Sequence, residues 1–485
     1  MINLFHAANW DFSMANYDVV WSFLVQMGLV LIFLLIGNLL RTVVPFLRKS
    51  LIPSALIGGL LLLILNIILG LFDVTLIDKS AMQVITYHGL GIGFIAMTLK
   101  VAKPKGKVAK VKMFENGILT GGAYMLQAVL GLLVTIVFFL LTKDSDNPIY
   151  YGSGLLLPLG YGQGPGNALT WDLNFSILLD NNGNQLFSGN GSFGLTIASV
   201  GFIVASLFGV LYINIYKRRG EIKVREQKFE TREVTEFEED NEIPDSESVD
   251  KFSIQLGLVF LGYALSFGFM VGLGAISDFT NSIAWGFNFI WGVIFATLIK
   301  FVITKLHKKK VIKKKYINNY QMDRISGFAF DAMIVAGVAA IEIEDVKRYI
   351  WPLIVLCVVG AFSTYLYLRK VTKNCFKGYE HEMFVTNFGT VTGTASNGMI
   401  LLKEIDPNFV TPASNLFVLS QFPAMVCVAP LLLLLNFASK SFTNTLIALG
   451  IFFVLFMAYT IFLFRRRIFK RKYKEPEEVW QEPVK

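Results

Sequence analysis

Two glycine-rich runs carry the residue types that could bind an ion. The first, GYGQGPGN (160–167), has glycine at every second position and includes Pro165. The second, TNFGTVTGTASNGM (386–399), mixes glycine with threonine, serine and asparagine. Glycine and proline both disfavour the interior of an apolar helix, so we expect the backbone to be unwound at both runs. Unwound carbonyls and nearby hydroxyl or amide oxygens can bind Na⁺, and helix N-termini beside them attract an anion.

Polar side chains in and next to both runs add to this candidate site. Irregular backbone at membrane depth persists only where it packs in protein or lines a watered cavity, so two breaks that enter from opposite faces can meet near the midplane. The alternative is a seam of small residues between packed helices. A phosphate-binding loop is disfavoured because no strand precedes and no Lys-Ser/Thr pair follows. The polar side chains are Gln163, Asn167 and Thr170 at the first run, and Thr386, Asn387, Thr390, Thr392, Thr394, Ser396 and Asn397 at the second.

One acidic residue lies deep in an apolar run, Asp331 in SGFAFDAMIVAGVAA (326–340). A charge near a helix centre costs at least about 2.5 kcal/mol in a membrane, so Asp331 is a candidate Na⁺ ligand, proton carrier or partner of an amino group. The alternative is a neutral acid that bonds to a neighbouring helix. Lysine and arginine are absent from the interiors of the apolar runs, so helix dipoles and co-transported cations must neutralise a bound anion. Weaker polar candidates are His88, Gln127, Glu382 and Gln421.

Membrane-spanning helices must position these residues. The 485-residue chain is 54% hydrophobic and only 16% charged, where a soluble chain has about 25% charged residues. Its apolar runs are roughly 20 residues long, which is enough to cross a ~30 Å hydrocarbon core. We therefore predict an all-α integral membrane protein embedded in a lipid bilayer. The runs cover residues 19–40, 52–72, 83–100, 117–141, 193–216, 252–276, 282–304, 325–341, 349–368, 414–436 and 443–464.

The basic residues predict the orientation of these spans. With the N-terminus outside and the C-terminus cytoplasmic, the inner segments hold 39 of the 44 lysines and arginines, as the positive-inside rule requires. This works only if each glycine run enters and leaves on the same side. Basic clusters such as KLHKKKVIKKK (305–315) are then orientation anchors in the plasma (cytoplasmic, cell inner) membrane, and we expect no nucleic-acid partner despite the net charge of +9.

The spans divide into two equivalent halves. Residues 1–216 and 251–436 each hold five spans, with a break before the fifth at about 153–172 and 383–403 respectively. Five is odd, so the second half is inverted relative to the first, as in transporters built from inverted-topology repeats. Residues 217–250 are a charged cytoplasmic linker, and residues 437–485 hold an extra span and a basic cytoplasmic tail.

Three segments resemble the bacterial sodium/glutamate symporter (ESS) family. They are FLRKSLIPSALIGGLLLLI (46–64), PLGYGQGPGNALTW (158–171) and GYEHEMFVTNFGTVTGTASNGMILLKEI (378–405). The resemblance implies a homodimer of inverted five-span repeats, in which a substrate-carrying part moves past a scaffold in the manner of an elevator. It also implies glutamate uptake driven by Na⁺. The chain departs from the family pattern at Gln163, where histidine is usual, and at Pro165, where threonine is usual.

The resemblance also implies which residues line the site. The expected substrate-binding residues, with Asn397 added from the polar content of its run, are Gly162, Gln163, Gly164, Gly166, Asn167, Thr392, Gly393, Thr394 and Asn397. The expected sodium-binding residues, with Asp331 and the run's own oxygens added, are Asn387, Gly389, Thr390 and Asp331.

These observations favour a secondary active transporter for glutamate or a related amino-acid or dicarboxylate anion, coupled to Na⁺. Proton coupling is the alternative that Asp331 leaves open. A channel or passive pore is an alternative from another class, because opposed re-entrant segments also build selectivity filters. We expect no enzyme activity and no cofactor, since the spans contain no His-Glu-x-x-His, no nucleophile elbow and no paired aspartates, and three unpaired cysteines predict no disulfide or metal site.

Overall fold

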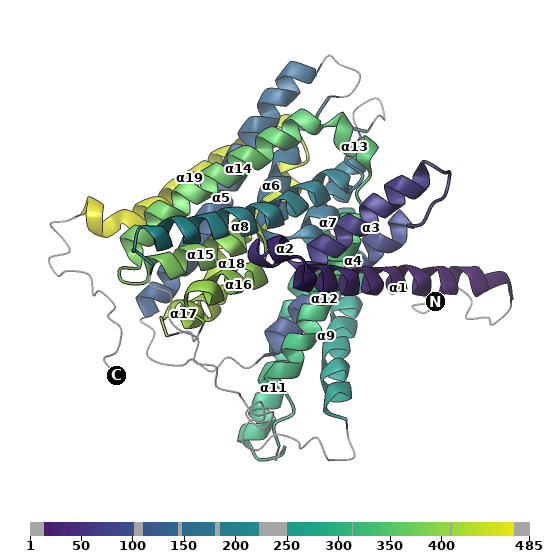
Figure 1. The fold of residues 1–485 in the computed structure, drawn as a ribbon, viewed down its shortest axis with the longest axis horizontal. Helices are drawn as coiled ribbons and strands as arrows, with labels where there is room; N and C mark the ends of the chain where they lie inside the picture. The colour runs from purple at the N-terminus through teal and green to yellow at the C-terminus, as the bar shows by residue number, and fades with distance from the viewer. Residues whose placement is uncertain are drawn as a thin grey trace.

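A computed structural model describes residues 14–100, 110–143, 148–179, 185–222, 250–312, 314–407 and 410–469 (Figure 1). Within these ranges the elements are helices, apart from one isolated bridge between Leu179 and Gln185. Most of the predicted linker (223–249) and the basic tail beyond residue 469 lie outside the described residues.

Helices cover each predicted span, but a break at Phe287 divides the span 282–304 and a break at Ser420 divides the span 414–436. In the described ranges, nine helices are long and apolar enough to cross a membrane, which supports a multi-pass membrane protein. The other two are α3, which has 17 residues, and α12, which contains the charged residues Asp323, Arg324 and Asp331. The spans are α1 Met14–Val43, α3 Ser54–Gly70, α4 Lys79–Leu99, α5 Lys110–Thr142, α8 Ser192–Arg218, α9 Lys251–Gly274, α11 Asn288–Lys308, α12 Asn319–Ala339, α14 Ile350–Cys375, α18 Gln421–Ala438 and α19 Phe442–Ile468.

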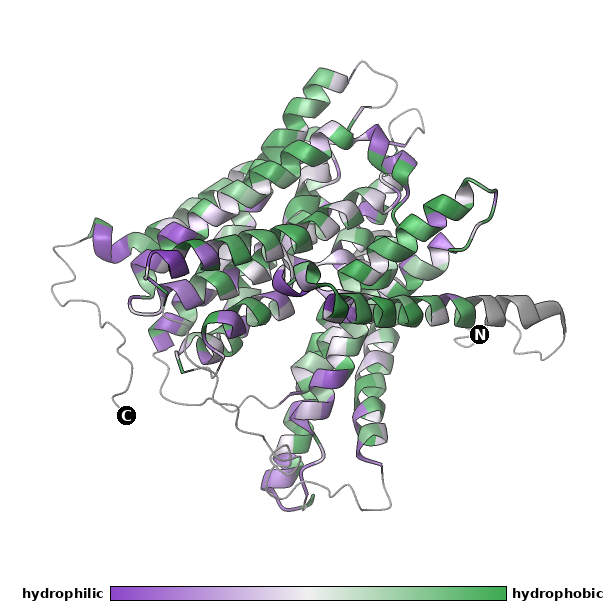
Figure 2. Cartoon of the chain, viewed as in Figure 1, coloured by the Kyte–Doolittle hydropathy of each residue, from purple (hydrophilic) through white to green (hydrophobic). Residues whose placement is uncertain are grey.

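Polar contacts sort the helix ends into two groups, and hydrophilic residues gather at these ends (Figure 2). At what we call the basic end, Lys100 pairs with Asp323 at 2.5 Å, which joins the end of α4 to the start of α12. At the opposite end, Lys79 pairs with Asp345 at 3.4 Å, and Tyr150 Oη donates to the Ser439 carbonyl at 3.1 Å. Each contact joins ends that alternating spans would place on one side of a membrane.

The long helices form two groups. In the first, α1 packs against α3 and α9 against α11, and both pairs rest on α4 and α12. These two pairs project from the rest of the molecule in different directions (Figure 1). In the second group, α5 packs against α14, α18 and α19. The short helices that hold the glycine runs lie between α8 and these groups, so they are enclosed by long helices on several sides.

The last long helix, α19, is joined to the rest of the second group by a buried ion pair. Arg465 Nη2 lies 2.6 Å from Glu115 Oε1, and the two side chains are 13% and 2% exposed. Glu115 also pairs with Lys112 at 3.0 Å. Although most of α19 faces outward, this contact attaches its basic end firmly to the start of α5.

We predict that Glu115→Ala destabilises the protein by about 3–5 kcal/mol, because it leaves two cations without their buried partner. The measurement is the midpoint of thermal unfolding in detergent. The control is Glu344→Ala, which breaks an exposed pair with Lys347, whose side chains are 84% and 65% exposed, and should change stability by less than about 1 kcal/mol. Equal stability of Glu115→Ala and the parent would contradict the role of this pair.

Candidate binding site at two helix breaks

The first glycine run forms a helical hairpin. Helix α6 (Leu156–Gln163) follows the short 3₁₀ helix η1 (Tyr151–Leu155), and α7 (Pro165–Ser176) returns toward the same end. The turn is made by Gly164, whose φ of 84° belongs to the left-handed region that favours glycine. Pro165 suits the first position of α7, because its missing N–H would have no partner there. The sequence-predicted break is therefore real, and it is one residue long.

The second run forms a hairpin from the basic end. Helix α15 (Glu380–Thr392) ends at Gly393, and α16 (Ala395–Ile405) returns to the basic end, where Lys217 reaches Glu404 at 3.4 Å. The two arms pack closely through Gly389 and Gly398: a Cβ added to Gly389 would lie 2.7 Å from the backbone nitrogen of Gly398. These glycines are needed for the close approach of the arms.

The tips of the two hairpins lie next to each other, and α6 packs against α15. A Cβ built on Gly164 would lie 3.8 Å from Thr394 Cγ2 and 3.8 Å from Met333 Cε of α12. The four arms have 8, 12, 13 and 11 residues, which corresponds to about 12–20 Å each at 1.5 Å per residue. One arm from each side therefore spans about the thickness of a ~30 Å hydrocarbon core, and the tips meet about halfway.

Both tips present helix N-termini whose backbone N–H groups are not capped by a side chain. The N-cap residues Gly164 and Thr394 make no side-chain cap bond, and the first intrahelical bonds are donated by Ala168 and Gly398. The N–H groups before these donors lack intrahelical partners. Residues 164–167 at the start of α7 are buried, whereas at the start of α16 Thr394 and Ala395 are half-buried and Ser396 is exposed. A buried helix end without partners, as in α7, is unusual in a folded protein and is typical of an anion site.

Two buried side-chain atoms at the tips also lack a partner among the described residues. Asn167 Oδ1 and Asn397 Nδ2 make no hydrogen bond, although the side chains are only 1% and 5% exposed. Asn167 uses its other amide atom to donate to Gln163 Oε1 at 2.7 Å, and Asn397 Nδ2 lies against Gly393. An unsatisfied buried polar group costs about 1–3 kcal/mol, so a bound polar ligand would relieve this cost.

Gln127 of α5 holds the second tip in place. Its Nε2 donates to the carbonyl of Val391 at 3.0 Å and to Thr364 Oγ1 of α14 at 2.9 Å. The carbonyl of Val391 is among the last of α15, so this bond satisfies a group that the helix leaves free. The Gln127 side chain is completely buried and its Oε1 has no partner in the described structure. From the sequence, Gln127 is only a weaker polar candidate, because only the fold shows that it faces the break.

The other predicted residues lie along the hairpin arms. A Cβ on Gly162 would meet the ring of Tyr124, and one on Gly166 would meet Leu90 at 2.7 Å, so both serve close packing. The polar side chains of Asn387, Thr390 and Thr392 bond back to carbonyls of α15 at 2.6–2.8 Å. These residues share the second hairpin with the tip, and only Thr392 lies directly at the break.

Asp331 is not brought together with the tips. On α12 it shares a face with Val335 and Val338, which pack against Gly59 of α3. Met333, which contacts Gly164, lies about 200° around the helix from Asp331 at 100° per residue. The charged group that acts on Asp331 is Arg41 of α1. Asp331 therefore belongs to the contact between α12 and the α1–α3 pair, a position that its depth in the sequence could not distinguish from a ligand-facing one.

A second acid, Asp172 of α7, is completely buried and was not selected from the sequence. Its Oδ2 accepts the backbone N–H of Gly194 at 2.7 Å, and its Oδ1 accepts from Ser176 Oγ at 3.4 Å. A carboxyl group at the N-terminus of α8 is favoured by the helix dipole, so Asp172 fastens α7 to α8. Its place inside the first glycine-rich segment was the signal that sequence reasoning overlooked.

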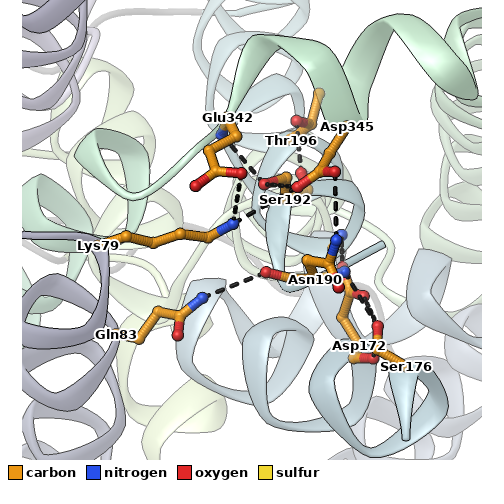
Figure 3. A network of polar contacts seen from close by, with 10 residues as sticks. Lys79, Gln83, Asp172, Ser176, Asn190, Ser192, Thr196, Glu342 and Asp345 are labelled. Carbon is orange, nitrogen blue, oxygen red and sulfur yellow. Dashed lines mark hydrogen bonds and ion pairs between the residues drawn. The ribbon is translucent and has the colours of Figure 1, made fainter. Parts of the chain in front are cut away.

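This bond belongs to a larger polar network (Figure 3). Asp345 of α13 (Ile343–Arg348) accepts from Asn190 Nδ2 and Ser192 Oγ, both at 3.2 Å. Asp345 and Glu342 also pair with Lys79 at 3.4 and 2.9 Å. The network joins α4, α7, α8 and α13 at the opposite end, so it supports the first hairpin from outside the break.

No protein-family model and no curated protein matches this chain. The function of the site therefore has to be inferred from its geometry.

We predict that Asp172→Ala lowers the free energy of unfolding by about 1–3 kcal/mol, because it leaves the buried N–H of Gly194 without an acceptor. The measurement is thermal unfolding in detergent. Asp172→Asn keeps a side-chain oxygen at this position and should lose less stability than the alanine variant. If both variants unfold like the parent, Asp172 does not fasten α7 to α8.

Proposed function

We propose that this protein is a secondary active transporter of the sodium/glutamate symporter type. It would carry glutamate, or a related amino-acid or dicarboxylate anion, together with Na⁺. The observation that supports this proposal is the close approach of Gly164 and Thr394, because it brings together the tips of two hairpins that come from opposite ends of the bundle. Two broken helices that meet at mid-depth are typical of substrate and ion sites in secondary transporters.

At the tips, groups that favour an anion lie close to groups that favour a cation. The N-termini of α7 and α16 each provide roughly half a positive charge and free N–H groups for an anion. The C-termini of α6 and α15 provide carbonyl oxygens for a cation, and Asn167 Oδ1 and Gln127 Oε1 add unpartnered oxygens nearby. The described residues of both tips include no lysine or arginine, so Na⁺ and the helix dipoles would balance the charge of the anion. This arrangement favours joint binding of anion and cation.

We further propose that the chain contains two inverted repeats, each with five spans and a hairpin. The contacts support this pairing: α3 packs on α12 as α11 packs on α4, and α1 contacts α12 as α9 contacts α4. The helices α1, α3 and α4 of the first half correspond to α9, α11 and α12 of the second half. When each helix is replaced by its counterpart, the first contact of each pair becomes the second. By the same proposal α19 is an addition to the second repeat, and the chain forms a homodimer in the plasma membrane with its C-terminus in the cytoplasm.

Alternating access would follow from relative motion of the two helix groups. The first tip lies at their boundary, where Gly164 faces Met333 and a Cβ on Gly337 would lie 3.0 Å from Pro165 Cβ. Such close, small-residue contacts allow one group to slide on the other, as an elevator mechanism requires. A permanently open channel is disfavoured, because the residues from Gly164 to Asn167 are buried between the groups.

The test is uptake by the purified protein in liposomes, with labelled L-glutamate, L-aspartate and succinate. We expect saturable uptake against a concentration gradient when Na⁺ is higher outside, and none without an ion gradient. Asp331→Asn should leave the Na⁺ dependence unchanged, because Asp331 faces α1 and α3. Uptake that ignores Na⁺ but collapses with a protonophore would instead assign proton coupling, and flux that never exceeds equilibrium would assign a passive pore.

We predict that Asn167→Ala and Asn397→Ala each reduce the initial uptake rate at least about tenfold, because a bond to a charged ligand contributes about 1.5 kcal/mol or more. Membrane insertion and thermal stability should stay close to those of the parent, since Asn167 Oδ1 and Asn397 Nδ2 have no protein partner and Asn167 Nδ2 bonds to Gln163 one turn before it on the same hairpin. Thr297→Ala is the control, as its exposed hydroxyl bonds only to the Val293 carbonyl of its own helix. Normal uptake by both asparagine variants would show that the binding site does not lie at the tips.

A further inference from the structure

A cleft outside the helix breaks leads toward the first tip. It has a volume of about 470 Å³ and lies between α4, α7 and α10 (Asp278–Gly286). Its lining includes Gln83, Tyr87, Thr170, Asn174 and Trp285. It opens at the opposite end, beside the network that contains Lys79 and Asn190, and Gln83 donates to the Asn190 carbonyl at 3.2 Å (Figure 3).

One face of α7 connects the cleft to the break. Asn174 Nδ2 donates to the Thr170 carbonyl at 2.8 Å, and Thr170 Oγ1 donates to the Gly166 carbonyl at 2.8 Å. These residues are four apart and therefore lie in one row along the helix. The row ends at Gly166, which is in the first turn after the break at Gly164. A solute that follows the row would arrive at the proposed site.

The side chain of Leu90 closes the inner end of this row. A Cβ on Gly166 would lie 2.7, 3.0 and 3.1 Å from three side-chain carbons of Leu90. Leu90 is three residues beyond Tyr87 on α4 and is only 1% exposed. Asn167, with its unpartnered Oδ1, is the next residue of α7 after Gly166. Leu90 is therefore the apolar side chain that packs on the end of the row nearest to the break.

We propose that the cleft is a vestibule that receives a small amphipathic solute of the amino-acid class, and that Leu90 closes it toward the helix breaks. That the solute in the vestibule is the one transported rests on the proposed function. The existence of the vestibule and its closure by Leu90 do not depend on that function. The vestibule connects the opposite end of the molecule with the first hairpin, so it is one of the two half-paths that alternating access requires.

The lining favours an amino acid over a dicarboxylate. The described residues that line the cleft include no lysine, arginine, aspartate or glutamate, and Nδ1 of the one histidine among them, His88, is hydrogen-bonded to Tyr263 Oη. A dianion would lose water there without gaining an ion pair, which is unfavourable. A zwitterion carries its own counter-charge, and the side-chain amides of Gln83 and Asn174 can bond to its two charged groups. Its side chain would pack on Leu169, Leu173 and Trp285.

Thiol labelling of the full-length protein in membranes tests the vestibule without transport. Single cysteines are placed at Asn174 and Asn167 in a Cys427→Ser background, because Cys357 and Cys375 are buried. A charged, membrane-impermeant thiol reagent is applied to one side at a time, and modification is read by mass. We expect Asn174→Cys to react from one side only and Asn167→Cys to react at least tenfold more slowly. Reaction of Asn174→Cys from both sides or from neither would overturn the proposal.

The closure is tested by shortening Leu90. Leu90→Ala should raise the reactivity of Asn167→Cys at least tenfold from the side that labels Asn174→Cys, and Leu90→Val should give a smaller rise. Leu132→Ala, at a fully buried leucine of α5, is the matched control for general loosening of the fold. An equal rise with Leu132→Ala, or no rise with either Leu90 variant, would show that Leu90 does not close the path.

The class of solute is tested by protection. L-glutamate and L-glutamine should slow labelling of Asn174→Cys, and succinate should not; protection by succinate, or by none of the three, would overturn the assignment to amino acids. The exposed Ile276→Cys (71% exposed) should label at one rate with or without solute. If no variant and no parent protein transports any of these solutes, the proposed function fails, while the labelling pattern still decides whether the vestibule and its closure exist.

Discussion

Backbone groups that lose their helical partners inside an apolar bundle must be satisfied in another way, and this constraint shapes the whole structure. In water the turn at Gly164 would be hydrated at little cost. Within a membrane each unsatisfied group costs several kcal/mol, so the chain can be interrupted only where other groups, water or a ligand replace the lost bonds. The second tip is partly satisfied by Gln127, which bonds to the Val391 carbonyl. The N-termini of α7 and α16 have no side-chain cap, and the proposed ligand would bind there.

Some buried polar groups of the protein stabilise the fold, and others remain available for hydrogen bonding. Glu115, Asp172 and Asp345 each have defined partners that join one helix to another. By contrast, Asn167 and Asn397 keep buried atoms without partners near the point where the two hairpins meet. Satisfied networks give rigidity, and unsatisfied groups are tolerated where they serve binding. Stability and the proposed function therefore use different polar residues.

Glycine has two separate roles in the hairpins. Gly164 provides a backbone angle that other residues adopt only with strain. Gly389 and Gly398 instead remove side-chain bulk, so that the arms of the second hairpin can touch. Close packing of this kind replaces the hydrophobic effect as the force between helices in lipid. The same small-residue contacts at the boundary of the two helix groups explain how a well-packed protein could still allow one group to slide.

The sequence alone determined the elements, because their causes are local. Apolar length predicts a spanning helix, and Gly164 with Pro165, like Gly393, interrupts a helix wherever it lies. Helices cover all eleven predicted runs, nine helices of the described residues are long and apolar enough to cross a membrane, and both breaks are present. It did not determine which way a side chain faces. Asp331 and Met333 are two residues apart in one apolar run, yet only Met333 faces the break, because the packing of α12 against α3 and α4 sets its rotation. The tertiary structure likewise decided that the two tips meet, that Gln127 bonds to one of them, and that Asp172 joins α7 to α8, since each contact links residues far apart in the chain and depends on how whole helices pack.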